Sequence, residues 1–397
     1  MLRPWFRSAK RCFGTSYTVH LVSSQAQAER LSRELLLKLR KRSPNESSIA
    51  KIALDCEGVR LGRFGRLSLM QMQDEDGQVM LCDALRPGIV EAFRPLLESP
   101  SVVKVIHDCR EDSSALYHQH GIGLRGIFDT QVAHASLERA AGREAYQASA
   151  SELLQKYLNI DPDDSELKSL MLEDPQLWGR RPLSKALVSY AVRSVAYLLP
   201  LHELLMEKTN AALQEEIAEA SALAADYRFL NREFPTAESM AKIGTRLWAL
   251  MASRGRDKLL LKLNGRVGMV CTPSALKRFK DVKLGDLVYC CVSGVSIDGR
   301  YLYLDRYDHD WDYFDHQLRP SSQPEVGAYG REHRFSTSMF SHDLDPLFLR
   351  GLPGLADQAV DAWDASAEDV GMDPEDTGFV GGWRLSLSGS TLMFVAC

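Results

Sequence analysis

Short apolar runs alternate with longer amphipathic stretches along the first half of the chain. Runs rich in β-branched and aliphatic side chains predict strands over residues 17–22, 52–57, 67–72, 79–82 and 102–106. The acidic segment 74–77, which ends in Gly77, predicts a hairpin turn between two of these strands. Polar–apolar repeats predict helices over 25–40 and 89–97, and helical patterns dominate from 107 to about 252. A three-stranded meander followed by alternating strands and helices predicts a mixed α/β domain with helices on both sides of a sheet.

The pattern becomes β-like after Lys258. Apolar runs at 259–263, 267–271, 287–292 and 301–304 are separated by segments that contain Gly265, Gly285 and Gly299. Short strands at this spacing predict a small barrel. Residues 285–288, followed by a strand, resemble S1-type oligonucleotide-binding barrels, and a generic β module is the alternative.

Composition and charge limit the possible functions. The 48 Lys and Arg against 53 Asp and Glu give a net charge of −5, which excludes a histone-like coating role. Any nucleic-acid site must therefore be a local patch. No run of about 18 apolar residues exists, so we expect no membrane-spanning helix.

The two ends of the chain have biased compositions. Residues 1–28 contain basic side chains and no acidic one, which is typical of a mitochondrial transit peptide. The alternative is a disordered basic tail that touches RNA, in a cytoplasmic protein. Residues 341–376 carry ten acidic residues against one basic residue, so we expect a partly disordered segment that could recruit a protein partner.

Candidate chemistry begins with Asp55 and Glu57 at the end of a predicted strand. Residues i and i+2 of a strand point to the same side, so both carboxylates can converge on one cation. Magnesium and manganese prefer such oxygen ligands. The pair therefore indicates a candidate site for Mg²⁺ or Mn²⁺.

Further motifs follow in a fixed order. The segment 107–112 follows an apolar strand and opens a helix, and three later motifs lie at 128–130, 181–183 and 190–199. Together with residues 55–57 and 69–72, these motifs resemble the ribonuclease D-like branch of the 3′–5′ exonucleases, which includes Egalitarian-like proteins. The resemblance spans about residues 17–205, and it implies a ribonuclease H-like fold.

The resemblance implies a two-metal phosphodiesterase that shortens single-stranded ends, with RNA as the expected substrate. Asp55 would bridge both ions, Glu57 would hold the ion that carries the attacking water, and Asp112 would reach the second ion through water. Tyr190 would orient the attacking water. Two cations so placed stabilise both the entering hydroxide and the leaving oxygen.

The chain departs from this family pattern at Ser194. The family places an Asp four residues after the Tyr that corresponds to Tyr190, and here that residue is Ser194. A neutral hydroxyl is a poor ligand for a hard dication, so the departure argues against vigorous activity. The alternative to a weak exonuclease is a catalytically deficient exonuclease fold that serves as an RNA-binding adaptor.

The remaining candidates each have a structural alternative. His107 either touches the terminal nucleotide or is a satisfied structural residue. Arg180 and Arg181 either contact phosphates or lie on an exposed helix face. We expect Asp129 to cap a helix and Asp108 to be solvated or to cap a helix. The acidic and aromatic segment 308–316 is more typical of a solvated strand end than of a metal site.

These observations predict five consecutive segments. They are a transit peptide or basic tail, an exonuclease domain, a helical connector, a small β domain of possible OB or S1 type, and an acidic, partly disordered tail, at residues 1–16, 17–210, 211–256, 257–320 and 321–397.

Overall fold

The computed structural model describes residues 16–40, 50–161, 165–307, 379–380, 383–388 and 391–396. The chain divides into one compact unit of residues 1–306 and 363–397 and a second of residues 307–362. Of the second unit only Tyr307 is described. The segments 308–316 and 341–376, and all but the last residue of the expected transit peptide or basic tail, lie outside the described residues.

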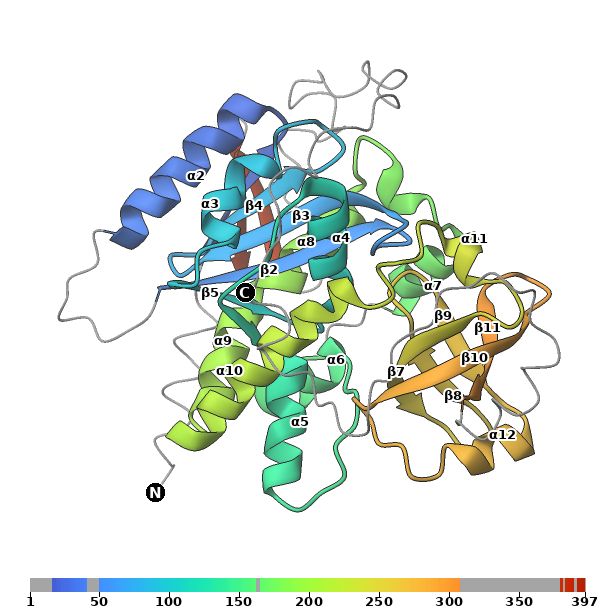
Figure 1. Cartoon of the computed structure of the whole chain (residues 1–397). Coiled ribbons are helices and arrows are strands. Elements are labelled where there is room, and N and C mark those ends of the chain that lie inside the picture. The colour runs from blue at the N-terminus through green and yellow to red at the C-terminus, as the bar shows by residue number, and fades with distance from the viewer. Residues whose placement is uncertain are drawn as a thin grey trace. The chain divides into compact units, whose positions relative to one another are not determined.

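A mixed sheet forms the centre of the first domain (Figure 1). Its six N-terminal strands follow the spatial order β1-β4-β3-β2-β5-β6, with bounds Ser16–Val22 (β1), Ala50–Val59 (β2), Arg66–Asp74 (β3), Gln78–Asp83 (β4), Val102–Ile106 (β5) and Ile127–Asp129 (β6). Strands β2, β3 and β4 form the predicted antiparallel meander, whereas β1, β5 and β6 each pair in parallel with a neighbour. The five strands predicted from the apolar runs are confirmed.

Helices cover both faces of this sheet, as the alternating pattern predicts. One face packs against α2 (Gln25–Arg40), the short turn η1 (Glu91–Phe93), α3 (Arg94–Leu97) and α4 (Arg110–His120). The other face packs against α5 (Thr130–Ala140), α6 (Ala150–Leu153), the π-helical turn η2 (Leu154–Leu158), η3 (Leu177–Gly179), α8 (Lys185–Ala196) and α9 (Leu198–Met206). Helix α7 (Ser165–Glu173) buries none of its own residues.

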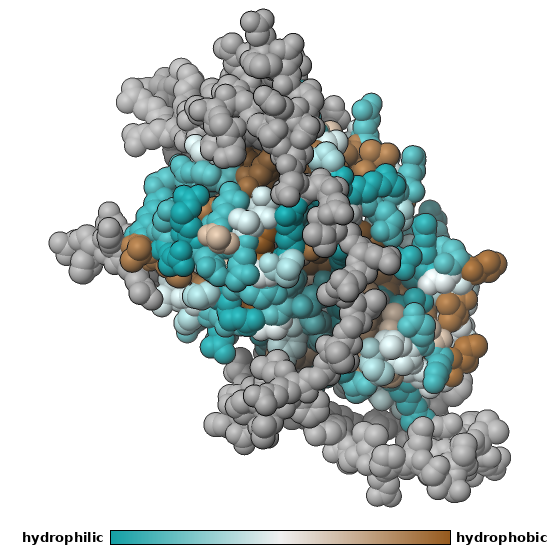
Figure 2. All heavy atoms as spheres, turned by 90° about the horizontal axis from the view of Figure 1, so that it is seen from above, coloured by the Kyte–Doolittle hydropathy of each residue, from teal (hydrophilic) through white to brown (hydrophobic). Residues whose placement is uncertain are grey.

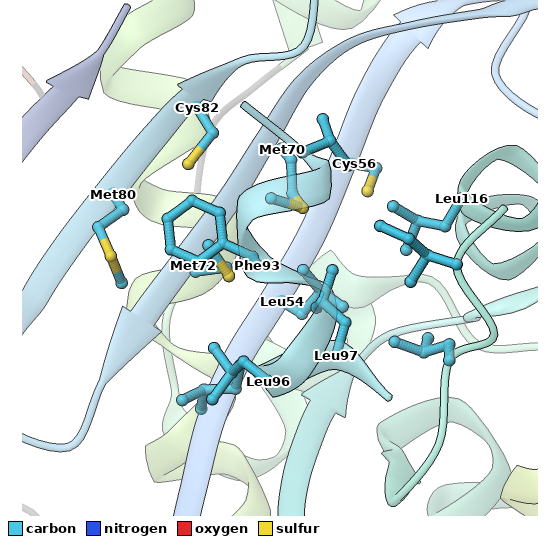
Figure 3. Close-up of a cluster of buried hydrophobic side chains, with 14 of the residues drawn as sticks. Leu54, Cys56, Met70, Met72, Met80, Cys82, Phe93, Leu96, Leu97 and Leu116 are labelled. Atoms are coloured by element: carbon cyan, nitrogen blue, oxygen red, sulfur yellow. The ribbon is translucent and has the colours of Figure 1, made fainter. Parts of the chain in front are cut away.

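Side chains along β2 alternate between the two faces of the sheet, so its core residues and its two candidate acids point in opposite directions. Ile52, Leu54 and Cys56 face the α3 and α4 side, where Figure 3 shows Leu54 and Cys56 among methionine, leucine and phenylalanine side chains. The side chains of Asp55 and Glu57 alternate with these, on the same face as α8 and α9. The register with β3 shifts between Glu57 and Gly58, so a bulge interrupts the pairing directly after the second acid.

A helical segment leads from the first domain to a barrel. It comprises α10 (Ala211–Ala225), η4 (Asp226–Phe229) and α11 (Ala237–Met240). The following residues form β7 (Arg246–Arg254), so the prediction of helix up to about 252 is wrong. Leu, Ala and Met favour helix in isolation, but alternate β7 side chains fill the barrel core, and this packing overrides the propensity.

The barrel is closed and has five strands. They are β7, β8 (Leu259–Lys262), β9 (Val267–Val270), β10 (Leu287–Val295) and β11 (Tyr301–Arg306), with α12 (Pro273–Arg278) between β9 and β10. The order is β7-β8-β9-β11-β10, and β10 closes onto β7. The third and fifth barrel strands, β9 and β11, are parallel, and the other four pairs of barrel strands are antiparallel. The predicted barrel is thus confirmed, and its first strand lies before the predicted boundary at 257.

The β8–β9 turn packs into the first domain. Asn264 is fully buried, and its side chain donates to the carbonyl oxygens of Arg228 and Leu230, both at 2.9 Å. The Ser114 hydroxyl on α4 donates to Asn264 Oδ1 at 2.5 Å. Asn264 also adopts a positive φ of 56°, which asparagine tolerates better than most residues. The barrel is therefore fixed to the helix that carries the third candidate acid.

Three strands near the C-terminus extend the sheet beside β1. They are β12 (Phe379–Val380), β13 (Trp383–Ser388) and β14 (Thr391–Ala396), and β14 pairs antiparallel with β1. These strands were not predicted for the C-terminal tail. Across the described ranges, no helix combines the length and the apolar character that crossing a membrane requires.

Candidate active site

Three acids from two elements form the candidate site. Asp55 and Glu57 come from the C-terminal half of β2, and Asp112 lies in the first turn of α4. The charges of Asp55 and Asp112 both act on Glu57, and Asp55 also acts on Asp112, so the fold brings the three side chains together. Over the described ranges, however, no three His, Cys, Asp or Glu side chains are arranged closely enough to hold a metal ion.

Burial and mutual repulsion disfavour the ionised forms of these acids. Burial raises the pKa of Asp55 to about 6, although Ser194 and the Cys56 backbone donate hydrogen bonds to it. The pKa values of Glu57 and Asp112 lie well above their usual ranges, first because of burial and then because of the neighbouring carboxylates. Asp55 and Glu57 retain partial access to solvent. The cluster therefore carries an electrostatic cost that a cation would remove.

The donor set suits a hard divalent cation in its chemistry. All three groups are carboxylates, and Asp112 Oδ1 is buried without a hydrogen-bond partner among the described residues. The Cys56 thiol donates to Asp112 from the core side. The three carboxylates therefore suit a divalent cation in their chemistry, but in the described structure they do not lie close enough together to surround one.

Ser194 faces this cluster from α8. Its hydroxyl lies 3.0 Å from the Ala191 carbonyl oxygen and also forms a hydrogen bond with Asp55. The position expected for a fourth acid therefore does adjoin the acids, but it supplies a hydroxyl. Tyr190 lies one helical turn earlier on α8, with its ring 6.1 Å from that of Trp178. Its predicted role in orienting water stays a prediction.

Gln71 is a polar neighbour that the sequence analysis missed. It is the cross-strand partner of Asp55 on β3, and its side chain is fully buried. Neither Oε1 nor Nε2 has a hydrogen-bond partner among the described residues. Cross-strand partners share a face of the sheet, so this amide lies beside Asp55. A glutamine at an inward position of the otherwise apolar run 69–72 was the signal available in the sequence.

Asp108 differs from its prediction. We expected a solvated carboxylate or a helix cap, but Asp108 is largely buried and pairs with Arg110 and with Lys262 of the barrel, the latter at 2.9 Å. These two positive charges hold the pKa of Asp108 well below its usual range, against the effect of burial. Lys262 also lies 3.9 Å from Glu111. The error arose because Lys262 is distant in sequence.

Asp129 caps a helix, as predicted. It is the N-cap of α5 and accepts from the backbone N–H groups of Gln131 and Val132. The same carboxylate accepts from the backbone N–H groups of Asp108 and Cys109, at 3.0 and 2.8 Å. It therefore fixes the turn that leads into α4.

His107 lies in the same turn, before α4 begins. Its Nδ1 is 2.9 Å from the Thr130 hydroxyl, and burial lowers the pKa of its imidazole. These contacts are those of a residue with a structural role, and contact of His107 with a nucleotide stays a prediction.

The two arginines after η3 differ sharply. The Arg181 side chain is only 8% exposed and binds Asp83 Oδ1 through Nε at 3.0 Å. It also donates to the Ser68 and Trp178 carbonyl oxygens, at 2.6 and 2.9 Å. This structural role does not support the predicted phosphate contact of Arg181. Arg180 is 65% exposed and pairs with Asp174, so its phosphate contact stays a prediction.

Comparisons with known proteins show what this domain is similar to. The family described as 3′–5′ exonuclease matches residues 19–210. Ribonuclease D of Haemophilus influenzae is 33% identical over 155 residues, which cover 39% of this chain and 36% of that protein. The piRNA biogenesis protein EXD1 of Mus musculus is 31% identical over 172 residues, which cover 41% of this chain and 30% of that protein. The match thus spans about a third of the length of these curated relatives.

Solved structures are similar to this chain as well. The Trypanosoma brucei RNase D complex with RNA U12 is 19% identical and has a TM-score of 0.47, covering 81% of this chain and 95% of that one. Escherichia coli RNase D is 24% identical with a TM-score of 0.44, covering 53% of this chain and 50% of that one.

Proposed function

We propose, from the match of residues 19–210 to the family described as 3′–5′ exonuclease, that the protein shortens single-stranded RNA from its 3′ end. The proposal includes dependence on Mg²⁺ or Mn²⁺ and a rate lowered by Ser194. RNA is the proposed substrate because curated relatives of about 30% identity include ribonuclease D and a piRNA biogenesis protein.

The proximity of Asp55, Glu57 and Asp112 carries this proposal. Three carboxylates with raised pKa values destabilise the fold unless a ligand compensates them. Such a costly cluster at a strand end is typical of a functional site. A phosphodiester hydrolase needs this concentration of negative charge to hold divalent cations against its substrate.

The side chains have distinct proposed tasks. Asp55, Glu57 and Asp112 would hold the cation, which when bound lowers the pKa of water and neutralises charge on the phosphate. The Ser194 hydroxyl holds Asp55 in place through its hydrogen bond. Tyr190 would donate a hydrogen bond to the water or to the scissile phosphate.

A second candidate function is an RNA-binding adaptor, and Ser194 is the observation that favours it. A serine removes one full negative charge and one carboxylate ligand from the site. Loss of a ligand weakens cation binding and the positioning of the attacking water. The scaffold would then still hold an RNA end without cutting it.

One experiment separates the two candidates. Purified full-length protein and its Asp55→Asn and Ser194→Asp variants are incubated with 5′-labelled single-stranded RNA in Mn²⁺, and the products are resolved by length. Shortening by the wild type but not by Asp55→Asn supports the enzyme. Shortening by Ser194→Asp alone supports an adaptor that lost its activity. Retention of RNA without shortening by all three proteins would refute the enzyme.

Mn²⁺ binding measured by calorimetry adds a readout that does not depend on turnover. We expect wild type to bind Mn²⁺ more weakly than Ser194→Asp and more tightly than Asp55→Asn. Equal affinities for all three would refute the assignment of these residues to the cation.

Two further proposals concern the ends of the chain. We propose mitochondrial import through residues 1–16, on the basis of their basic, acid-free composition. A fluorescent fusion of the full chain should enter mitochondria, and a fusion that lacks residues 1–16 should stay in the cytoplasm.

We also propose that residues 341–376 recruit a basic protein partner, which pull-downs with and without this segment would test.

A further inference from the structure

An aromatic pair of one exposed tryptophan and one half-buried tyrosine lies on the outer surface of the barrel. Trp248 of β7 and Tyr289 of β10 are cross-strand partners, and their ring centroids are 5.0 Å apart at an interplanar angle of 49°. Trp248 remains 45% exposed. Figure 2 shows one face of the molecule, mainly hydrophilic with scattered apolar groups. The indole thus packs on the Tyr289 ring and keeps nearly half of its surface accessible, which offers a flat surface on which a base can stack.

The backbone beneath Trp248 is held in place. Its N–H donates to Asn231 Oδ1 at 3.0 Å, and its carbonyl accepts from Asn231 Nδ2 at 2.8 Å. The alternating residues Leu247, Ala249 and Met251 point inward and fill the barrel core. The barrel core is thus complete without the indole, which lies outside it on a rigid strand.

The charge of the barrel suits a polyanion. Residues 246–306 contain twelve Lys and Arg against five Asp, within a chain whose net charge is −5. Arg246 lies two residues before Trp248 on the same face, close enough to act on the Tyr289 hydroxyl, and Glu233 is the acid that faces the pair. The β7–β8 turn adds Arg256 and Lys258, both exposed. The barrel as a whole therefore carries an excess of positive charge, which favours the approach of a polyanion.

The aromatic pair also adjoins the exonuclease domain. In the β7–β8 ladder, Leu250 pairs with Lys262, whose ammonium binds Asp108 just before α4. Asn264, two residues beyond Lys262, contacts Ser114 of the helix that carries Asp112. Trp248 shares Asn231 with Leu263 as a hydrogen-bond partner. The surface thus continues from the interface that borders the candidate active site.

We propose that the Trp248–Tyr289 face of the barrel binds the single-stranded RNA that lies 5′ of the end held at Asp55, Glu57 and Asp112. Bases stack on the exposed indole, and Arg246 together with the positive charge of the barrel attracts the phosphates. Stacking needs no particular base, so the surface holds unpaired RNA of any sequence. The choice of RNA as the ligand rests on the proposed function.

Binding of RNA by the full chain tests this surface. Fluorescently labelled oligouridylates of about 4 and about 16 nucleotides are titrated in EDTA. These lengths bracket the number of nucleotides that one oligonucleotide-binding barrel usually covers. Trp248→Ala and Tyr289→Ala are compared with the conservative Trp248→Tyr and with Leu172→Ala, which removes an exposed apolar side chain on α7. Thermal unfolding of each variant reports whether its fold is intact.

We expect wild type to bind the longer RNA more tightly than the shorter one. Trp248→Ala should weaken binding of the longer RNA about 5- to 100-fold and leave the shorter RNA unchanged, whereas Trp248→Tyr and Leu172→Ala should bind as wild type does. Equal binding of the longer RNA by Trp248→Ala and wild type would overturn this inference alone and assign the face to another partner. Equal weakening for both lengths would also overturn it. Failure of wild type to bind either RNA in EDTA would overturn this inference, whereas the proposed RNA substrate is tested separately by the shortening assay in Mn²⁺.

Discussion

Replacing Asp55 with asparagine should make the cation-free protein more stable at neutral pH. Asparagine has the size of aspartate but no charge, so Asp55→Asn removes the repulsion with Glu57 and Asp112 without leaving a cavity. The Ser194 hydroxyl can still donate to the amide oxygen. A variant that loses activity would thus gain stability, which is the trade-off expected at a functional cluster.

The magnitude follows from the pKa of Asp55. A rise from 3.8 to about 6 corresponds to about 3 kcal/mol of unfolding free energy, and solvent access to Asp55 makes this an upper value. The folded-state pKa lies above the unfolded value, so the folded protein binds the extra proton between pH 4 and 6. The stability that this proton provides is lost as pH rises through 6. The difference between the variant and wild type should therefore be largest at pH 7 and vanish near pH 4.

Thermal unfolding in EDTA at several pH values measures this effect. At pH 7 the midpoint for Asp55→Asn should exceed that of wild type by roughly 5–10 °C, given about 2–4 °C per kcal/mol for a domain of this size. Added Mn²⁺ should raise the midpoint of wild type more than that of the variant, because only wild type keeps all three carboxylates.

Ser189→Ala, on α8 but outside the acid cluster, serves as a control. The difference between its unfolding midpoint and that of wild type should not depend on pH in this way. A variant at position 55 that is less stable than wild type at pH 7 in EDTA would refute the electrostatic reasoning. So would a stability difference that stays constant from pH 4 to pH 7.

Three other substitutions test separate regions of the structure. Burial lowers the pKa of His202 to about 4, so between pH 6.5 and pH 4 the unfolded chain binds a proton that the folded protein does not. The free energy of unfolding should therefore fall by up to about 3 kcal/mol as the pH drops from 6.5 to 4. His202→Phe should reduce this pH dependence in acid unfolding curves. An unchanged slope would contradict the assignment. Arg181→Met should cost about 3 kcal/mol in denaturant unfolding because it leaves the buried Asp83 with Arg86, at 3.5 Å, as its remaining ion-pair partner, whereas the neighbouring, exposed Arg180→Met should cost less than about 1 kcal/mol. Similar costs for both would contradict the structural role of Arg181. Asn264→Ala should cost about 2–4 kcal/mol because three buried polar groups lose their partner, and it should increase hydrogen exchange in α4. Unchanged exchange there would show that the barrel does not support this helix.

Local pattern predicted most of the first domain. Five strands and the helices on both sides of the sheet follow from apolar runs and periodicity, because these patterns reside within each element and need no distant partner. The segment that became β7 was mispredicted because its residues favour helix, and only the pairing with β8 and β10 selects the strand. Strand β14 pairs with β1 across more than 350 residues of chain, and the local sequence does not indicate so distant a partner.

Local patterns in the amino-acid sequence were enough to identify the residues that could form a cation site. Asp55 and Glu57 share a strand face because side chains alternate, and the order of motifs indicated that Asp112 and Ser194 would join them. The tertiary structure alone decided the surroundings of these groups. It buried Gln71 beside Asp55, paired Asp108 with Lys262 and placed Arg181 in an internal ion pair. Burial and charge depend on neighbours that are distant in the chain, so electrostatics and exposure emerge only once the sheet, helices and barrel have packed.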